Sequence, residues 1–152
     1  MPKPIVFDDC HVINTVYLES EKRWIWLDPT FDAYVMDENG QLLGIQEVRE
    51  RLINGKPLIL NPTANWNFQN SQTKEYYLYT YMAKNLYRLE CPINSTSDLE
   101  TPIKGKTLEY VQLLPLDGLN QIPEVDVIKI ENSGMTYKTY ITNNPNTFWE
   151  DF

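Results

Sequence analysis

The segment 11–27 constrains the fold of this chain most, because it is typical of two strands joined by a tight turn. Residues 11–17 alternate between two faces, which is the period of a β-strand. Residues 19–22 (ESEK) are polar and turn-like, and residues 23–27 (RWIWL) are rich in the aromatic and β-branched types that strands favour. The sequence therefore predicts a β-hairpin.

This hairpin places the only histidine of the chain, His11, near an acidic residue. An even-numbered turn centred on residues 20–21 pairs Ile13 with Asp28, so that Asp28 lies on the same face as His11 and on the neighbouring strand. Strands lie about 4.8 Å apart, and diagonal neighbours remain within reach of long side chains. We therefore expect His11 and Asp28 to interact, provided that no one-residue bulge reverses the parity.

The rest of the chain predicts two helices followed by strands. Apolar residues at helical spacing predict a helix over 44–54 and a second helix over 73–90. Residues 106–116 and 125–142 are typical of strands, the latter a hairpin. The asparagine-rich segment 58–72 reads as a loop, and its length suggests a function or a cover over another part of the molecule.

The order of sheet, helices and sheet indicates the α+β class, with an antiparallel β-sheet and two main helices. The chain has 152 residues, which is enough for one domain with its own core. No linker or internal repeat is visible. We therefore predict a single domain over 1–152, with residues 4–8 forming a short first strand.

Composition excludes several classes of function. The net charge is −8 and the basic residues are scattered, which argues against nucleic acid or an anionic membrane as partner. No apolar run approaches the roughly 20 residues that span a bilayer. The first ten residues do not resemble a signal peptide, so the localisation stays open, and a longer parent protein could be exported. One His and two Cys do not supply the usual zinc ligands, and no phosphate-binding glycine loop is present, so we expect no metal and no cofactor.

The stretch HVINTVY, with KRWIWLDPT after it, resembles the second half of the transglutaminase-like domain, in the papain-like cysteine-enzyme superfamily. In that family a strand histidine and an aromatic-rich strand ending in Asp-Pro-Thr supply the base and its orienting carboxylate. The resemblance implies that His11 and Asp28 have these catalytic roles. It also implies a truncated transglutaminase-like core over 1–70, similar to a bacterial branch of often unassigned function, and a helix and β-hairpin extension over 71–152.

The family's nucleophilic cysteine lies well upstream of the histidine, at the N-terminus of a buried helix, where the helix dipole favours a thiolate. Neither cysteine of this chain fits that place. Cys10 directly precedes His11, and successive strand residues point to opposite faces. Cys91 follows the end of a predicted helix, where the dipole disfavours a thiolate.

Three hydroxyl residues, Thr15, Ser20 and Thr30, lie near the pair in the sequence, but none of them lies in a strained nucleophile turn. The sequence thus predicts the His-Asp part of a Cys-His-Asp triad without its cysteine, and a chain that is inactive alone. The parent activity would be hydrolysis of peptide or amide bonds, or acyl transfer, on a peptide or protein substrate.

Two other interpretations remain open. A non-catalytic module could use an aromatic surface to bind a protein or a glycan, with Trp26 and Trp66 as candidate substrate contacts and Phe68 nearby. Packing of Trp66 against the sheet is the simpler explanation for that residue. Alternatively, the chain is a fragment that forms a homodimer through an exposed sheet face.

Overall fold

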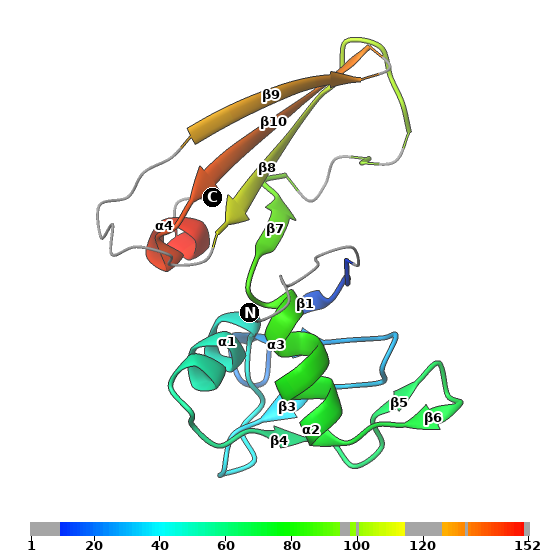
Figure 1. Ribbon diagram of the computed structural model, residues 1–152, viewed down its shortest axis with the longest axis vertical. Helices are drawn as coiled ribbons and strands as arrows, with labels where there is room; N and C mark the ends of the chain where they lie inside the picture. The colour runs from blue at the N-terminus through cyan, green and yellow to red at the C-terminus, as the bar shows by residue number, and fades with distance from the viewer. Residues whose placement is uncertain (1–9, 95–97, 100, 115–125, 133, 151–152) are drawn as a thin grey trace, which may run out of the picture. The chain divides into compact units, whose positions relative to one another are not determined.

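The chain divides into two compact units, residues 1–86 and residues 87–152. The structure, a computed structural model, describes residues 10–94, 98–99, 101–114, 126–132 and 134–150 (Figure 1). The strand expected over 4–8 lies outside the described residues. Strands and helices occur in both units, as the α+β class requires. The single domain over 1–152, with a core over 1–70 and an extension over 71–152, stays a prediction.

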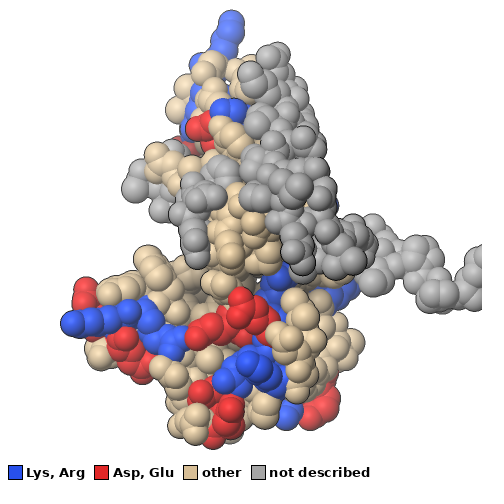
Figure 2. All heavy atoms as spheres, turned by 90° about the vertical axis from the view of Figure 1, so that its left-hand side faces the viewer, with Lys and Arg blue, Asp and Glu red and all other residues tan. Residues whose placement is uncertain are grey.

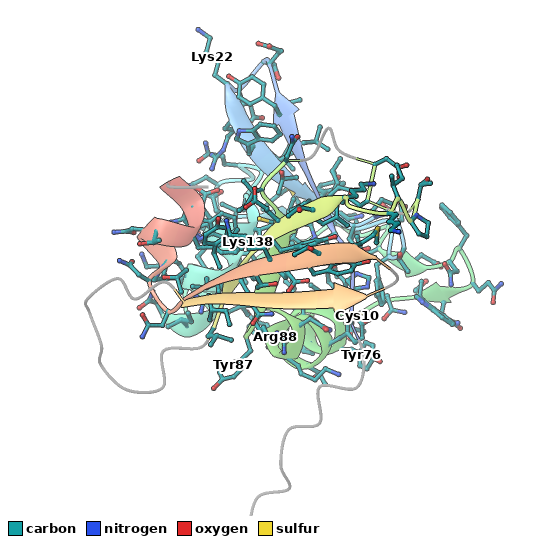
Figure 3. All side chains as sticks on the ribbon, turned by 90° about the horizontal axis from the view of Figure 1, so that it is seen from above. Cys10, Lys22, Tyr76, Tyr87, Arg88 and Lys138 are labelled. Atoms are coloured by element: carbon teal, nitrogen blue, oxygen red, sulfur yellow. The ribbon has the colours of Figure 1, made fainter. Side chains whose placement is uncertain are left out.

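The first unit begins with the expected hairpin. Strands β1 (Asn14–Leu18) and β2 (Arg23–Leu27) are antiparallel, with Leu18 opposite Arg23 and Asn14 opposite Leu27. This register continues to the pairing of residue 13 with residue 28 that the sequence predicts, so the turn and its parity are confirmed. Lys22 lies at the tip of the hairpin with a positive φ of 52° (Figure 3).

Helix α1 (Ile45–Ile53) confirms the first predicted helix. Its N-terminus is capped by the carboxylate of Glu47, which accepts a hydrogen bond of 2.8 Å from the backbone N–H of Gly44 and also pairs with Arg23. A Cβ at Gly44 would lie 2.9 Å from the carbonyl oxygen of Trp24. Only glycine therefore fits where the helix begins, and this close approach holds α1 against β2.

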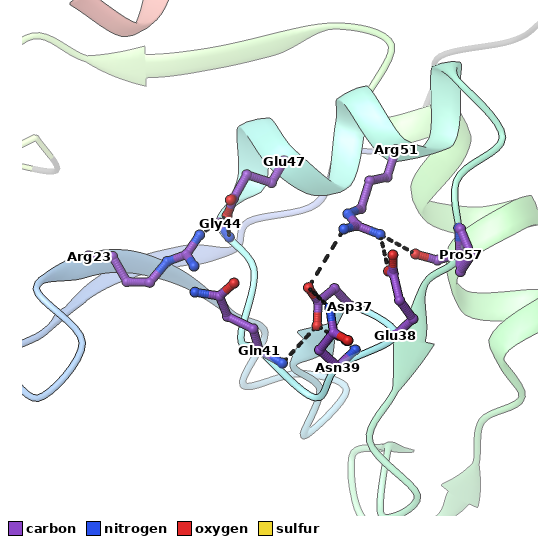
Figure 4. A network of polar contacts seen from close by, with 9 residues as sticks. All are labelled: Arg23, Asp37, Glu38, Asn39, Gln41, Gly44, Glu47, Arg51 and Pro57. Carbon is purple, nitrogen blue, oxygen red and sulfur yellow. Dashed lines mark hydrogen bonds and ion pairs between the residues drawn. The ribbon is translucent and has the colours of Figure 1, made fainter.

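A polar network closes the turn after strand β3 (Val35–Met36), which pairs with β4 (Ile59–Leu60) (Figure 4). Asp37 Oδ1 accepts hydrogen bonds of 2.9 and 2.8 Å from the backbone N–H groups of Asn39 and Gln41. These bonds, with that of Gln41 first, lower the pKa of Asp37. Arg51 of α1 pairs with Asp37, so the turn is tied to the helix. Figure 2 shows acidic and basic side chains side by side on the charged face of this unit.

The segment 58–72 is more ordered than the predicted loop. Besides β4 it contains a small hairpin of β5 (Asn65–Trp66) and β6 (Asn70–Ser71). Three residues, 67–69, connect the strands; Asn67 and Phe68 both have positive φ, and the N–H of Gln69 donates to the carbonyl of Trp66 at 3.0 Å. The prediction missed this turn because Phe rarely adopts positive φ.

The second predicted helix is shorter than 73–90. A continuous helical stretch consists of α2 (Lys74–Tyr76), the π-helix η1 (Tyr77–Met82) and α3 (Ala83–Asn85). The chain then enters strand β7 (Leu89–Pro92), where Cys91 lies opposite Val111. The expectation that Cys91 follows a helix end is therefore wrong, because pairing with another strand takes over a segment that also has helical spacing.

The second unit contains a four-stranded sheet in the order β7, β8 (Thr107–Leu113), β10 (Met135–Thr142), β9 (Asp126–Asn132). The predicted hairpin over 125–142 is confirmed. Strands β8 and β10 are parallel, so this sheet is mixed, whereas the strand pairs of the first unit are antiparallel, as predicted. Helix α4 (Pro145–Glu150), which was not predicted, packs Phe148 against Val111 and Leu113.

Candidate functional site

The structure brings His11 and Asp28 together, as the hairpin register predicts. His11 lies just before β1 and Asp28 just after β2, and His11 Nε2 is 2.6 Å from Asp28 Oδ2. Both side chains are largely shielded from solvent, with 7% of the His11 side chain and none of the Asp28 side chain exposed. We call this pair the His-Asp dyad.

Asp28 is buried and surrounded by donors. Its Oδ1 accepts from the backbone N–H groups of Thr30 at 3.1 Å and Phe31 at 3.3 Å. The Asp-Pro-Thr sequence favours this local turn, because Pro29 fixes its own φ and an aspartate side chain bonds readily to N–H groups two or three residues on. Oδ2 accepts from the hydroxyl of Tyr77 at 2.7 Å, besides contacting His11. A buried carboxylate requires such partners, and here both oxygens have them.

Tyr77 was not foreseen from the sequence. It is the first residue of the π-helix η1 and its side chain is fully buried. Burial raises the pKa of its phenol, and the neighbouring charge of Asp28 raises it further. Both effects favour the protonated phenol, which is the form that donates to Asp28.

The imidazole of His11 packs against two aromatic rings that also contact each other. Phe31 and Tyr81 meet it edge-on, with centroid distances of 5.4 and 5.3 Å and interplanar angles of 76° and 72°. These contacts fix the plane of the ring while Asp28 holds Nε2. The nitrogen left for proton exchange with a reacting group is therefore Nδ1.

The candidate nucleophiles are not seen at this nitrogen. Cys10 is a free, exposed thiol, and within the described part of the chain neither Cys10 nor a serine forms a hydrogen bond with the His11 ring. Cys91 belongs to the second unit, and burial, followed by the charge of Glu90, raises the pKa of its thiol. Thr30 contributes its backbone N–H to Asp28, as described above. Thr15 in β1 and Ser20 in the hairpin turn are both exposed.

The two candidate substrate contacts have different environments. Trp26 has no exposed surface and packs edge-on against Tyr77, with ring centroids 6.3 Å apart. A substrate contact by Trp26 is therefore wrong, because this residue of β2 faces the core and supports the ring that holds Asp28. Trp66 is 43% exposed, so it does not simply pack against a sheet.

Trp66 lines a pocket of about 560 Å³ in the first unit. The other lining residues are Phe31, Asn70, Gln72, Tyr76 and Tyr81. Since Phe31 and Tyr81 also contact the ring of His11, the pocket adjoins the dyad. Of its residues the sequence singled out only Trp66. The aromatic residues of 76–81 are too closely spaced for periodicity to show which of them face this pocket.

The described ranges contain neither a cluster of metal ligands nor a helix that could span a membrane. Within the described ranges, no group of three or more His, Cys, Asp or Glu side chains is placed to hold a metal ion. None of the helices in those ranges has the length and apolar character that crossing a bilayer requires. A scan against protein-family models, a search of curated proteins and a search of solved structures each found no match to this chain.

Proposed function

We propose that residues 11–86 form the base-and-carboxylate part of a transglutaminase-like acyl-transfer site, acting on peptide or amide bonds. The observation that supports this most is the 2.6 Å contact between His11 Nε2 and the buried Asp28. An ordinary cross-strand polar pair does not need a carboxylate with four donors or an imidazole packed edge-on against two aromatic rings. Both features are expected of a base whose orientation and tautomer matter.

In the proposed reaction the thiolate of a cysteine attacks the carbonyl carbon of an amide. His11 Nδ1 takes the thiol proton and then gives it to the departing amine, as the C–N bond breaks and a thioester forms. Water or a second amine then cleaves the thioester. Asp28 stabilises the imidazolium that exists between the two proton transfers, and Tyr77 keeps Asp28 in place. Because neither cysteine is seen at Nδ1, the proposal assigns the thiol to another polypeptide or segment.

The single histidine makes this proposal testable on the chain alone, by supplying the missing thiol as a reagent. With cysteamine as the thiol and p-nitrophenyl acetate as the acyl donor, release of p-nitrophenol reports base catalysis. We expect His11→Gln to lose the protein-dependent rate and Asp28→Asn to lose about tenfold or more of it. Equal rates for the native chain and His11→Gln, with both folded by circular dichroism, would contradict the proposal.

A second candidate is a binding module without catalysis, and the observation that favours it is the exposed hairpin of β5 and β6. Phe68 at its turn is 80% exposed and Trp66 is 43% exposed. If a peptide or glycan binds equally well to the native chain and to the double variant His11→Gln/Asp28→Asn, and thiolysis never depends on His11, this function replaces the first.

A further inference from the structure

The pocket beside the dyad has an unusual lining. Among the described residues it is lined by four aromatic rings, from Phe31, Trp66, Tyr76 and Tyr81, and two carboxamides, from Asn70 and Gln72, and by no charged side chain. Its volume of about 560 Å³ is in the range of sites that bind small molecules or single side chains. An acidic ligand would meet the negative faces of the rings and a chain of net charge −8.

A cationic ligand is also disfavoured, although aromatic faces attract cations. The ammonium group of Lys84 already lies over the ring of Tyr81, 5.9 Å from its centroid. A second positive charge at that ring would be repelled by the first. The pocket is therefore suited to an uncharged group with an apolar body.

Backbone hydrogen bonds connect the pocket to the dyad. The N–H of Asn65 donates to the carbonyl of Phe31 at 2.7 Å, and the N–H of Asn67 donates to the carbonyl of Thr30 at 2.9 Å. The N–H groups of the same Thr30 and Phe31 hold Oδ1 of Asp28. The hairpin that carries Trp66 is thus anchored on the loop that positions the carboxylate, which links ligand contact to the catalytic geometry.

The turn of this hairpin adds a separate observation. Phe68 has a φ of 58°, in the left-handed region that glycine or asparagine adopts with much less strain, and yet its ring is 80% exposed. Neither the turn nor the core of the described unit requires a phenyl ring there. Strained and exposed aromatic residues cluster at ligand-binding elements.

We propose that this aromatic-amide pocket is the specificity site of the acyl-transfer centre and holds an uncharged, ring-bearing side chain of a peptide substrate. This inference rests on the proposed function for the identity of the substrate. Gln72 Nε2 donates to the carbonyl of Asn70, which leaves Gln72 Oε1 to accept from a peptide N–H. The Asn70 carboxamide offers a donor and an acceptor for the peptide backbone.

The test uses capped tetrapeptides and the full chain. The probe acetyl-Ala-Phe-Gln-Ala-amide is titrated against ¹⁵N-labelled protein, and its relatives carry Glu, Lys or Ala in place of Phe. The readout is the indole N–H signal of Trp66, assigned with Trp66→Phe. We expect the Phe peptide to shift this signal and the Glu, Lys and Ala peptides to bind about fivefold more weakly or worse.

Variants locate the binding site. Asn70→Ala and Gln72→Ala, both changes at the protein surface, should each weaken binding of the Phe peptide by about threefold or more. The Trp66 variants have no indole signal, so their binding is followed through the backbone N–H signals of Asn70 and Gln72. Trp66→Ala should abolish binding and Trp66→Phe should restore most of it. Trp24→Phe is the matched control, because Trp24 is exposed on β2 and does not line the pocket. It should leave binding unchanged.

Each outcome favours or overturns the inference. Equal binding of the charged peptides, no binding of any peptide, or binding of N-acetylchitotetraose in place of the peptides would overturn it. The titration is repeated with His11→Gln, which should still bind because His11 does not line the pocket. If the peptide binds but thiolysis does not depend on His11, the proposed function fails and the pocket remains a peptide site. If thiolysis depends on His11 but no peptide binds, only the pocket inference fails.

Discussion

Asp28 Oδ2 is shared by the ring of His11 and the hydroxyl of Tyr77, so the tyrosine helps to fix the position of the carboxylate. Tyr77→Phe removes one donor to a buried charge and should lower the free energy of unfolding by about 1–3 kcal/mol in urea titrations. Tyr79→Phe is the control, since Tyr79 is 47% exposed and should change stability very little. A Tyr77→Phe variant as stable as the control would contradict this account of the site.

The raised pKa of Tyr77 also has a consequence at alkaline pH. Burial, followed by the charge of Asp28, keeps the phenol protonated in the folded chain. The unfolded chain ionises its tyrosines near pH 10, so this contribution to stability is complete below about pH 10 and is lost progressively above it. The fall in unfolding free energy between pH 10 and 11.5 should be shallower in Tyr77→Phe. Parallel curves for the two proteins would contradict the prediction.

The two cysteines should differ sharply in reactivity. Cys10 is exposed, while burial and Glu90 raise the pKa of Cys91 and deplete its thiolate. With iodoacetamide at pH 8 we expect one fast and one slow alkylation, measured by intact mass. Cys10→Ser should remove the fast step and Cys91→Ser the slow one. Two equal rates would show that Cys91 is not shielded.

Individual site residues could be predicted from the sequence where the two-residue period of a β-strand applied. Residues 11–17 alternate and a short turn follows them, so the facing of His11 and Asp28 followed from counting across the turn, and the family resemblance supplied their roles. Tyr77 could not be found in this way, because aromatic residues occupy nearly every position of YYLYTY. Only the packing of the π-helix distinguishes the buried Tyr77 from the exposed Tyr76 and Tyr79.

The hairpin of β5 and β6 lies in a segment that the sequence predicts to be a loop. The backbone of its turn is strained at Phe68, which has a positive φ. Phe68→Gly relieves the positive φ and should stabilise the chain by up to about 1 kcal/mol, after allowance for the extra freedom of glycine when unfolded. Phe68→Ala keeps a Cβ and should bring no such gain. Urea titration of the two variants separates relief of strain from loss of the ring, and equal effects would show that φ is not the cause.

The periodicity of the sequence also gave wrong predictions where pairing between strands far apart in the chain determines the secondary structure. The end of the predicted helix over 73–90 contains residues with good helical spacing, yet Leu89–Pro92 pair with β8 instead. The parallel alignment of β8 and β10 depends on the order of strands in space, which alternation along one strand does not specify.

At the scale of the whole chain, the dyad and the pocket both lie within residues 1–86. The boundary to the second unit falls in a short connection between α3 and β7 that has no linker-like composition, so the sequence did not reveal it. Homodimer formation through an exposed sheet face stays a prediction. The residues that favour it are Tyr17 and Trp24, paired across β1 and β2 and exposed by 42% and 60%.

Sedimentation velocity at micromolar concentration tests this association. We expect a dimer of the native chain that dissociates in Trp24→Lys, because a charge at the centre of an apolar contact opposes burial. Trp66→Lys is the control for an exposed tryptophan on a different element and should leave the dimer intact. A monomeric native chain would contradict the prediction.

We infer that Asp28 bonds to Nε2 of His11 and thereby leaves Nδ1 to act as the base. The tautomer of the neutral imidazole tests it most directly, and the only histidine gives a single set of signals in a long-range ¹H–¹⁵N spectrum. At a pH where the ring is neutral, we predict a protonated Nε2 bonded to Asp28 and an unprotonated Nδ1, with this preference weakened in Asp28→Asn. A proton on Nδ1, or the same spectrum in Asp28→Asn, would contradict the account.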